Sequence, residues 1–529
     1  MNTRVVACLV LGAGFSWVIY AGAVGARQQS PRVDFTAKQS SAIRYLKVSN
    51  PGEDDRIGIG DPLVGVTLAM SADGNTLAVS TPHEDSGATG VNGNQQDESA
   101  WDSGGAYVFA RSGSTWVQQA YIKPSNTQSS DKFGFALAVS GDGNTLAVGA
   151  ILEDSNARGI NGNQMDNSAE SSGAVYVFAR TGTTWAQQAY VKASNTDAGD
   201  QFGWSVALNH DGTTLAVGAQ SEASGAAGIN ANQADNAAAD AGAAYVYVRR
   251  GTAWSQQAYI KASNAQGGDR FGFCLSLSGD GNTLATCGYD EDGTASGVNG
   301  PHNEGAGGSG AAYVFVRRGT AWSQEAYVKA SNTAPNAAMG SSIALSADGN
   351  TLAVGSADED SLSPGVDGNQ SYVPVNEGSA GAVYVYGRTN GVWVQQAYVK
   401  PSNPGPFDLF GIRIALSHDG SVLAAGSPFE SGAGRGVNPN QHDRSASQSG
   451  AVYVFLRKDG KWSQHAYLKA PNSDEYDEFG TGVALTARCS RQRPAAKMGG
   501  RREQAAIRAT TRFATPARCT CIENGGLTD

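Results

Sequence analysis

Carboxylate side chains recur along this chain at places where they could bind a cation. Asp131 stands just before one apolar run, and Glu153 and Asp154 stand just after the next. Calcium prefers oxygen ligands of this kind, so one hypothesis is a Ca²⁺ site in each repeat, with Asp131, Glu153 and Asp154 as its ligands in one of them. The alternative is that these side chains cap turns and bond to loop backbone. Recurrence in every repeat favours the alternative.

Groups typical of catalysis are sparse. The six histidines are scattered, and the sequence contains no nucleophile elbow, phosphate-binding loop or His-Glu-x-x-His motif. We therefore nominate no catalytic residue. Three aromatic residues, Trp101, Tyr289 and Tyr372, interrupt the pattern in or beside polar segments. These three are the predicted ligand contacts, whereas the recurring Trp and Tyr residues are predicted to pack in a core.

A sequence repeat indicates which structural elements must position these residues. The phrase Trp-x-Gln-x-Ala-Tyr occurs six times, and successive copies are 69, 69, 68, 71 and 69 residues apart. Its tryptophans are Trp116, Trp185, Trp254, Trp322, Trp393 and Trp462. A fixed period of this kind indicates one array in which each unit buries its apolar surface against the next.

One repeat contains four short apolar runs. The four strands are expected at 136–140, 145–150, 173–180 and 185–193. Asp142-Gly143 predicts a two-residue turn between the first two strands, and a long polar loop, 151–172, leads to the third. Four antiparallel strands per unit indicate a propeller blade. Alternate connections of such a sheet lie on one side, so the long loops and the linkers between blades share one face, which we call the long-loop face. Binding usually resides in such loops.

Phe-Gly pairs open five of these units, and Gly-Ala-Val-Tyr-Val-Phe forms the third strand at Gly173 and Gly450. The Phe-Gly pairs begin at Phe133, Phe202, Phe271, Phe410 and Phe479. Over residues 44–487 the chain resembles the FG-GAP repeat of integrin alpha-subunit propellers and their bacterial relatives. The resemblance implies a seven-bladed propeller, and the bacterial relatives are mostly exported. The family's Asp-x-Asp-x-Asp-Gly calcium loop is missing here. One carboxylate, such as Asp142, cannot supply six to eight oxygens, so its predicted role is turn geometry.

The expected fold class is all-β, a seven-bladed β-propeller. Six blades are complete and four-stranded, and the two ends of the repeat array indicate a truncated seventh. The seventh begins at 479–485, and 44–50 matches a fourth strand that would complete it. The pattern then fails. Residues 488–529 are basic, and they are either a genuine disordered tail or the product of a reading-frame shift.

The amino terminus predicts export. Arg4 precedes an apolar stretch, and small residues near 21–26 suit signal cleavage, so 1–26 is interpreted as a signal peptide and 27–43 as a linker. The alternative is an uncleaved membrane anchor. With cleavage, no membrane span is expected. The net charge of −10 argues against nucleic acid as a partner.

Cys274 and Cys287 flank the Asp280-Gly281 turn at equal distances. They should face each other at a non-hydrogen-bonded pair, where side chains approach most closely. They form either a disulfide, which export would favour, or two packed thiols.

The functional prediction is an exported, monomeric, non-enzymatic propeller that binds a protein or glycan through its long-loop face. The alternative is a glycan hydrolase or lyase with an unidentified carboxylate pair at the mouth of the central channel. The near-identity of the repeats favours binding, because an active site would make one repeat differ.

Overall fold

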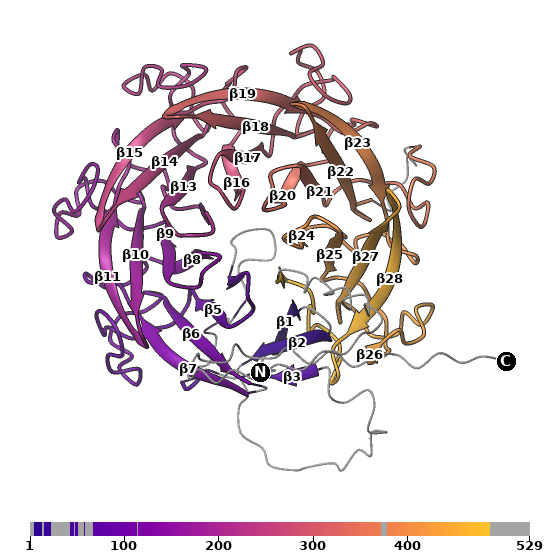
Figure 1. Cartoon of the computed structure of the whole chain (residues 1–529), viewed down its shortest axis with the longest axis horizontal. Coiled ribbons are helices and arrows are strands. Elements are labelled where there is room, and N and C mark those ends of the chain that lie inside the picture. The colour runs from indigo at the N-terminus through magenta and orange to yellow at the C-terminus, as the bar shows by residue number, and fades with distance from the viewer. Residues whose placement is uncertain are drawn as a thin grey trace, which may run out of the picture.

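The computed structural model describes residues 5–12, 15–22, 43–46, 48–50, 55, 58, 67–113, 115–371 and 378–486. Within these ranges every regular secondary-structure element is a β-strand. The sheets stand around a central axis like the blades of a propeller (Figure 1). No helix in the described part of the chain has the length and apolarity needed to span a bilayer.

Six blades repeat one up-and-down pattern of four antiparallel strands. Blade one has β4 (Leu68–Met70), β5 (Thr76–Thr81), β6 (Gly105–Ser112) and β7 (Thr115–Ile122). Blade two has β8 (Phe133–Val139), β9 (Thr145–Ala150), β10 (Ala174–Thr181) and β11 (Thr184–Val191). Blade three has β12 (Ser205–Leu208), β13 (Thr214–Ala219), β14 (Ala243–Arg250) and β15 (Ala253–Ile260).

Blades four to six continue the pattern around the ring. Blade four has β16 (Phe271–Leu277), β17 (Thr283–Gly288), β18 (Ala311–Arg318) and β19 (Ala321–Val328). Blade five has β20 (Met339–Leu345), β21 (Thr351–Ser356), β22 (Ala382–Thr389) and β23 (Val392–Val399). Blade six has β24 (Arg413–Leu416), β25 (Val422–Ser427), β27 (Ala451–Lys458) and β28 (Lys461–Lys469), with a short fifth strand, β26 (Gly436–Val437), outside β28. The first strand of each blade is the innermost (Figure 1).

The Asp-Gly turn is wider than predicted, yet it keeps the predicted register. The amide of Ser140 donates to Thr145 O at 2.9 Å, so four residues, 141–144, form the loop rather than two. The Asp142 carboxylate accepts from the Asn144 amide at 2.9 Å, and Gly143 has a φ of +73°. Asp142 thus serves the geometry of the turn.

The Phe-Gly motif joins neighbouring blades. Phe202 is fully buried and meets Tyr245 and Tyr247 edge-on, with ring centroids 5.3 and 6.2 Å away. Gly203 has a φ of +97°, and a Cβ there would lie 2.6 Å from Ala174 O. Only glycine lets the backbone pass so close to the adjoining strand, which explains why a large apolar residue is followed by glycine here, as Phe-Gly in five units and as Met339-Gly340 in blade five.

A further sheet lies between blades six and one, and it has a different topology. Its strands in order are β29 (Gly482–Leu485), β1 (Val5–Gly12), β2 (Phe15–Gly22) and β3 (Ile43–Tyr45). β1 runs parallel to β29, and β2 runs parallel to β3, so this sheet does not repeat the up-and-down blade. β1 and β2 fall within the predicted signal peptide. β29 contacts both β24 and β4, which closes the inner ring. The structure therefore shows six blades of the predicted kind, while the predicted tail, 488–529, lies outside the described residues.

Candidate ligand-binding face

Each blade contains a buried ion pair near the long-loop face. In blade two, Lys192 Nζ lies 2.9 Å from Glu153 Oε2 and donates to Ser172 Oγ at 2.7 Å. The Tyr190 hydroxyl donates to Glu153 Oε1 at 2.7 Å. Burial lowers the pKa of Lys192, and the charge of Glu153 opposes that shift. The other pairs are Glu84–Lys123, Glu222–Lys261, Glu291–Lys329, Glu359–Lys400 and Glu430–Lys469, with N–O distances of 2.6–2.9 Å.

These pairs correct one expectation from the sequence. The fourth strand carries Gln187, Gln188 and Lys192, a polar set expected at the outer edge of a blade. In the structure the two glutamines are half-buried and Lys192 is completely buried. The signal was present in the sequence, because a Glu and a Lys recur 38, 39 or 41 residues apart in all six repeats.

The three carboxylates proposed as calcium ligands are engaged otherwise. Lys192 supplies the positive charge beside Glu153 that a cation was expected to supply. Asp154 Oδ1 accepts from the Ser171 amide at 2.7 Å. Asp131 is buried, and burial, together with the charge of Glu153, raises its pKa to about 8. Across the described residues, no group of three or more His, Cys, Asp or Glu side chains is placed to hold a metal ion.

A short phrase, Gly-Val/Ile-Asn/Asp, recurs in the long loop of every blade and pairs with the outer strand of that blade. Its copies start at Gly90, Gly159, Gly228, Gly297, Gly365 and Gly436. In blade two the Asn161 amide donates to Tyr190 O at 2.8 Å, and the Tyr190 amide donates to Asn161 Oδ1 at 2.9 Å. Ile160 and Val191 form a β-bridge beside them. In blade six the same contact extends into β26, which lies outside β28 in Figure 1. The loop asparagines therefore protect an exposed sheet edge, in agreement with a structural role.

Three exposed aromatic side chains lie at crossings between a linker and the long loop of the preceding blade: Trp101 belongs to the loop, and Phe407 and Tyr476 belong to linkers. Trp101 is 66% exposed, Phe407 56% and Tyr476 47%. At each crossing one backbone amide donates at 2.8 Å to the loop carbonyl: Ser130 to Trp101, Phe407 to Gly378 and Tyr476 to Ser447. We call Trp101, Phe407 and Tyr476 the junction aromatics. All three lie on the long-loop face.

Two of the junction aromatics stand in a backbone conformation that disfavours them. Phe407 has a φ of +61° and Tyr476 a φ of +63°, in the left-handed region that bulky residues rarely adopt. The corresponding positions in other linkers are Ser130, Gly199, Gly268 and Asn336, which also have positive φ. Trp101 is one of the three ligand contacts predicted from the sequence, whereas Phe407 and Tyr476 are not among them. Aligning the linkers would have shown both as aromatic departures from a small polar position.

Trp101 stands beside a charged cluster. Lys132 Nζ lies 5.8 Å from the centroid of the Trp101 ring and 2.6 Å from Asp102 Oδ2. The other oxygen of Asp102 lies 2.8 Å from His83 Nδ1. The site therefore offers a flat apolar surface flanked by hydrogen-bonding groups.

The other predicted contacts are placed differently. Tyr289 is not on the outer surface of the loops: its ring stacks on Phe273 at 4.4 Å, and burial raises its pKa. Its hydroxyl bonds to Asp358, while neighbouring Asp290 pairs with Arg270 at 3.2 Å. Burial raises the pKa of both carboxyl groups. Tyr372 lies outside the described residues.

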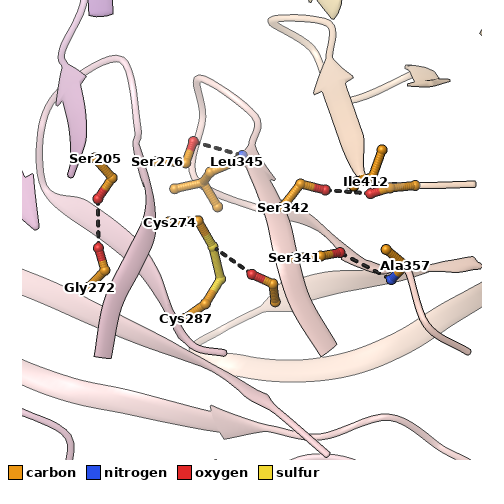
Figure 2. The surroundings of a disulfide bond; sticks show 12 residues. Ser205, Gly272, Cys274, Ser276, Cys287, Ser341, Ser342, Leu345, Ala357 and Ile412 are labelled. Carbon is orange, nitrogen blue, oxygen red and sulfur yellow. Dashed lines mark hydrogen bonds between the residues drawn. A yellow bond between two sulfur atoms is a disulfide. The ribbon is translucent and has the colours of Figure 1, made fainter. Parts of the chain in front are cut away.

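A disulfide joins Cys274 and Cys287 across β16 and β17, with their Cα atoms 5.4 Å apart (Figure 2). Cys287 is fully buried, whereas Cys274 is partly exposed. Cys274 Sγ also lies 3.3 Å from Gly340 O of blade five. The link therefore stands on the inner wall of the ring, where two blades meet.

Comparison with known proteins identifies the repeat. The FG-GAP repeat family matches residues 116–178, 185–247 and 254–315. Each match starts at the fourth-strand tryptophan of one blade and ends in the third strand of the next. No curated protein matches the sequence.

Two solved structures resemble the chain at low identity. The periplasmic gluconolactonase PpgL of Pseudomonas aeruginosa is 14% identical, with a TM-score of 0.42 over 78% of this chain and 86% of that one. Hydrazine synthase of Kuenenia stuttgartiensis is 13% identical, with a TM-score of 0.40 over 75% of this chain and 78% of that one.

Proposed function

Because this chain is an FG-GAP repeat protein built as a β-propeller, we propose that it is an exported, seven-bladed binding module that engages a protein or glycan through its long-loop face. The observation that carries the proposal is the set of junction aromatics, Trp101, Phe407 and Tyr476. They are large and exposed, and they stand at linker-loop crossings on the long-loop face.

The backbone at these crossings supports a binding role. An aromatic residue in the left-handed region costs about 1–3 kcal/mol and is tolerated where function requires it. Phe407 and Tyr476 nevertheless remain 56% and 47% exposed. A ligand on the long-loop face would cover this exposed part. Aromatic rings are enriched in the energetically dominant part of interfaces.

The seventh blade is supported by contacts of the segment that follows β3. The Ser49 amide donates to Gln118 Oε1 at 2.9 Å, as the Ser125 amide donates to Gln187 Oε1 at 3.1 Å one blade later. The Tyr107 hydroxyl bonds to Asn50 O at 3.3 Å. In the next blade the Tyr176 hydroxyl bonds to Asn126 Oδ1 at 2.6 Å. Ser49 and Asn50 therefore stand where the end of a fourth strand would stand, one blade before the first.

Export is supported by the apolar amino terminus and by the disulfide. Cross-links such as Cys274–Cys287 persist in oxidising compartments and are rare in the cytosol.

The test is an array of glycans and cell-surface proteins probed with the purified chain. The binding variant combines Trp101→Ser, Phe407→Ser and Tyr476→Ser, which gives each crossing a small residue of the kind other blades use. The control combines Val117→Ser and Val394→Ser, which remove exposed apolar side chains from the outer strands of blades one and five. We expect the binding variant to lose array signals that the control keeps. Equal signals from both variants would contradict the proposal. A panel of glycan hydrolase and lyase substrates on the same protein tests the enzymatic alternative.

A further inference from the structure

A cavity of about 90 Å³ lies between the inner strands. Its wall comes from residues in or just before the first strands of six different sheets, so it belongs to the ring as a whole. The lining includes aromatic rings (Trp204, Phe273), hydroxyl groups (Ser342, Thr481) and one guanidinium group (Arg413), together with aliphatic side chains such as Leu275 and Ile343. No Asp or Glu is among the described residues that line it.

Arg413 breaks the repeat at this point. It is the first residue of β24, and the corresponding positions of the other inner strands all carry smaller residues. Those residues are Thr67, Ala136, Ser205, Cys274, Ser342 and Gly482. The Arg413 Nη1 group donates to Ile412 O at 2.9 Å. Burial lowers the pKa of Arg413 to about 10, so the group still carries its charge at neutral pH. A single large cation therefore replaces a small side chain in one blade, which is the asymmetry expected of a site.

Thr481 supplies a second, independent observation. This residue lines the same cavity and is 5% exposed. Its Oγ1 atom has no hydrogen-bond partner among the described residues. Buried hydroxyl groups in native proteins are almost always hydrogen-bonded, so this one calls for a partner inside the cavity.

The opposite part of the wall is aromatic. The Trp204 ring lies 4.8 Å from that of Phe135 and 5.8 Å from that of Phe273, measured between centroids. These three residues come from consecutive blades, two to four. The counterparts in blades five and six are Ser341 and Ile412, so the aromatic surface covers only one side. Cys274 of the disulfide also lines the cavity, and Figure 2 shows it between Ser205 of blade three and Ser342 of blade five.

We propose that this cavity binds a small organic carboxylate. Its carboxylate oxygens would face the Arg413 guanidinium, which suits planar, bidentate recognition, and would accept from the Thr481 hydroxyl. Its hydrocarbon part would pack on Trp204 and Phe273. The volume sets the size: a cavity of about 150 Å³ holds benzene, so about 90 Å³ suits an acid of only a few carbon atoms. This site is separate from the long-loop crossings and does not depend on the function proposed for them.

The test is isothermal titration of the full chain with propionate and butyrate at neutral pH, with chloride and inorganic phosphate as comparison anions. We expect both acids to bind and the inorganic anions to bind at least about tenfold more weakly, because they lack the apolar part. Arg413→Gln should weaken acid binding by about 10- to 100-fold, as expected for losing charge-assisted hydrogen bonds. Thr481→Val, which keeps the shape, should weaken it several-fold. Arg457→Gln, in the third strand of blade six, is the matched control and should leave affinity unchanged.

Each variant is first compared with the wild type by thermal unfolding. If Arg413→Gln fails to fold, Thr481→Val and Trp204→Leu carry the test, and unchanged affinity in both would overturn the proposal. It would also be overturned if the wild type binds neither acid, or if phosphate binds as tightly as butyrate.

Discussion

The buried lysine of each blade gives the sharpest stability prediction. Lys192→Met removes the ammonium group that lies 2.9 Å from Glu153 and 2.7 Å from Ser172 Oγ, while keeping an unbranched side chain of similar length. Both members of the pair are almost wholly buried, so the variant leaves a carboxylate without its cation in the protein interior. Removing one partner of a buried ion pair costs about 3–5 kcal/mol, and we expect a loss of that size in the free energy of unfolding at neutral pH.

The assay is urea unfolding followed by circular dichroism, with two comparison variants. Lys461→Met changes an exposed lysine that also lies on a fourth strand, and it should shift stability by less than about 0.5 kcal/mol. Adding Glu153→Gln to Lys192→Met removes the uncompensated charge, so the double variant should be more stable than Lys192→Met alone by about 1–3 kcal/mol. If Lys192→Met costs no more than Lys461→Met, or if the double variant is the least stable, the buried pair does not act as described.

Three further predictions concern other parts of the molecule. Burial raises the pKa of Asp200 to about 8, so its proton stabilises the fold fully below the unfolded-state value of about 4 and ceases to do so as the pH rises through 8. Asp200→Asn should therefore reduce the loss of unfolding free energy between pH 6 and 9, by up to about 1.4 kcal/mol per pH unit, and identical pH profiles would contradict this. Replacing Cys274 and Cys287 by Ala should lower the free energy of unfolding by about 2–3 kcal/mol. Dithiothreitol should destabilise the wild type but not this variant. Mass spectrometry of protein recovered after export should show a chain that begins between residues 22 and 27, and a retained residue 1 would contradict signal cleavage.

The architecture of the blades was predictable because its determinants are local and periodic. The Asp142-Gly143 turn and the apolar runs beside it set a register that survives a loop wider than expected. That register also brings Cys274 opposite Cys287. Phe202-Gly203 could be recognised as part of a family pattern. The physical need for the pair is visible only in the structure, where the Phe202 ring packs between two blades and the backbone at Gly203 is too crowded for a side chain.

The residues that were missed depend on contacts between segments far apart in the sequence. A lysine on a strand rich in glutamine is normally solvated. Lys192 is buried because the long loop of its blade places Glu153 next to it. Phe407 is distinguished by the left-handed backbone conformation that it adopts in its linker, and amino-acid composition does not reveal that conformation. Arg413 is an ordinary residue of its strand until the ring places it in the wall of the same cavity as Trp204, which precedes a strand three blades away.

The place where β29 meets β4 has a consequence for how the protein is made. β4 is among the first segments to leave the ribosome, and β29 is the last strand of the array to be synthesised. Throughout translation, then, the nascent chain is an open arc with an uncovered flank at each end, and the two flanks cannot shield each other until more than four hundred residues have emerged. A pause shortly before β29 is synthesised would prolong the period in which those flanks can pair with another molecule, so the yield of folded protein should respond to the speed at which the segment that carries β29 is translated.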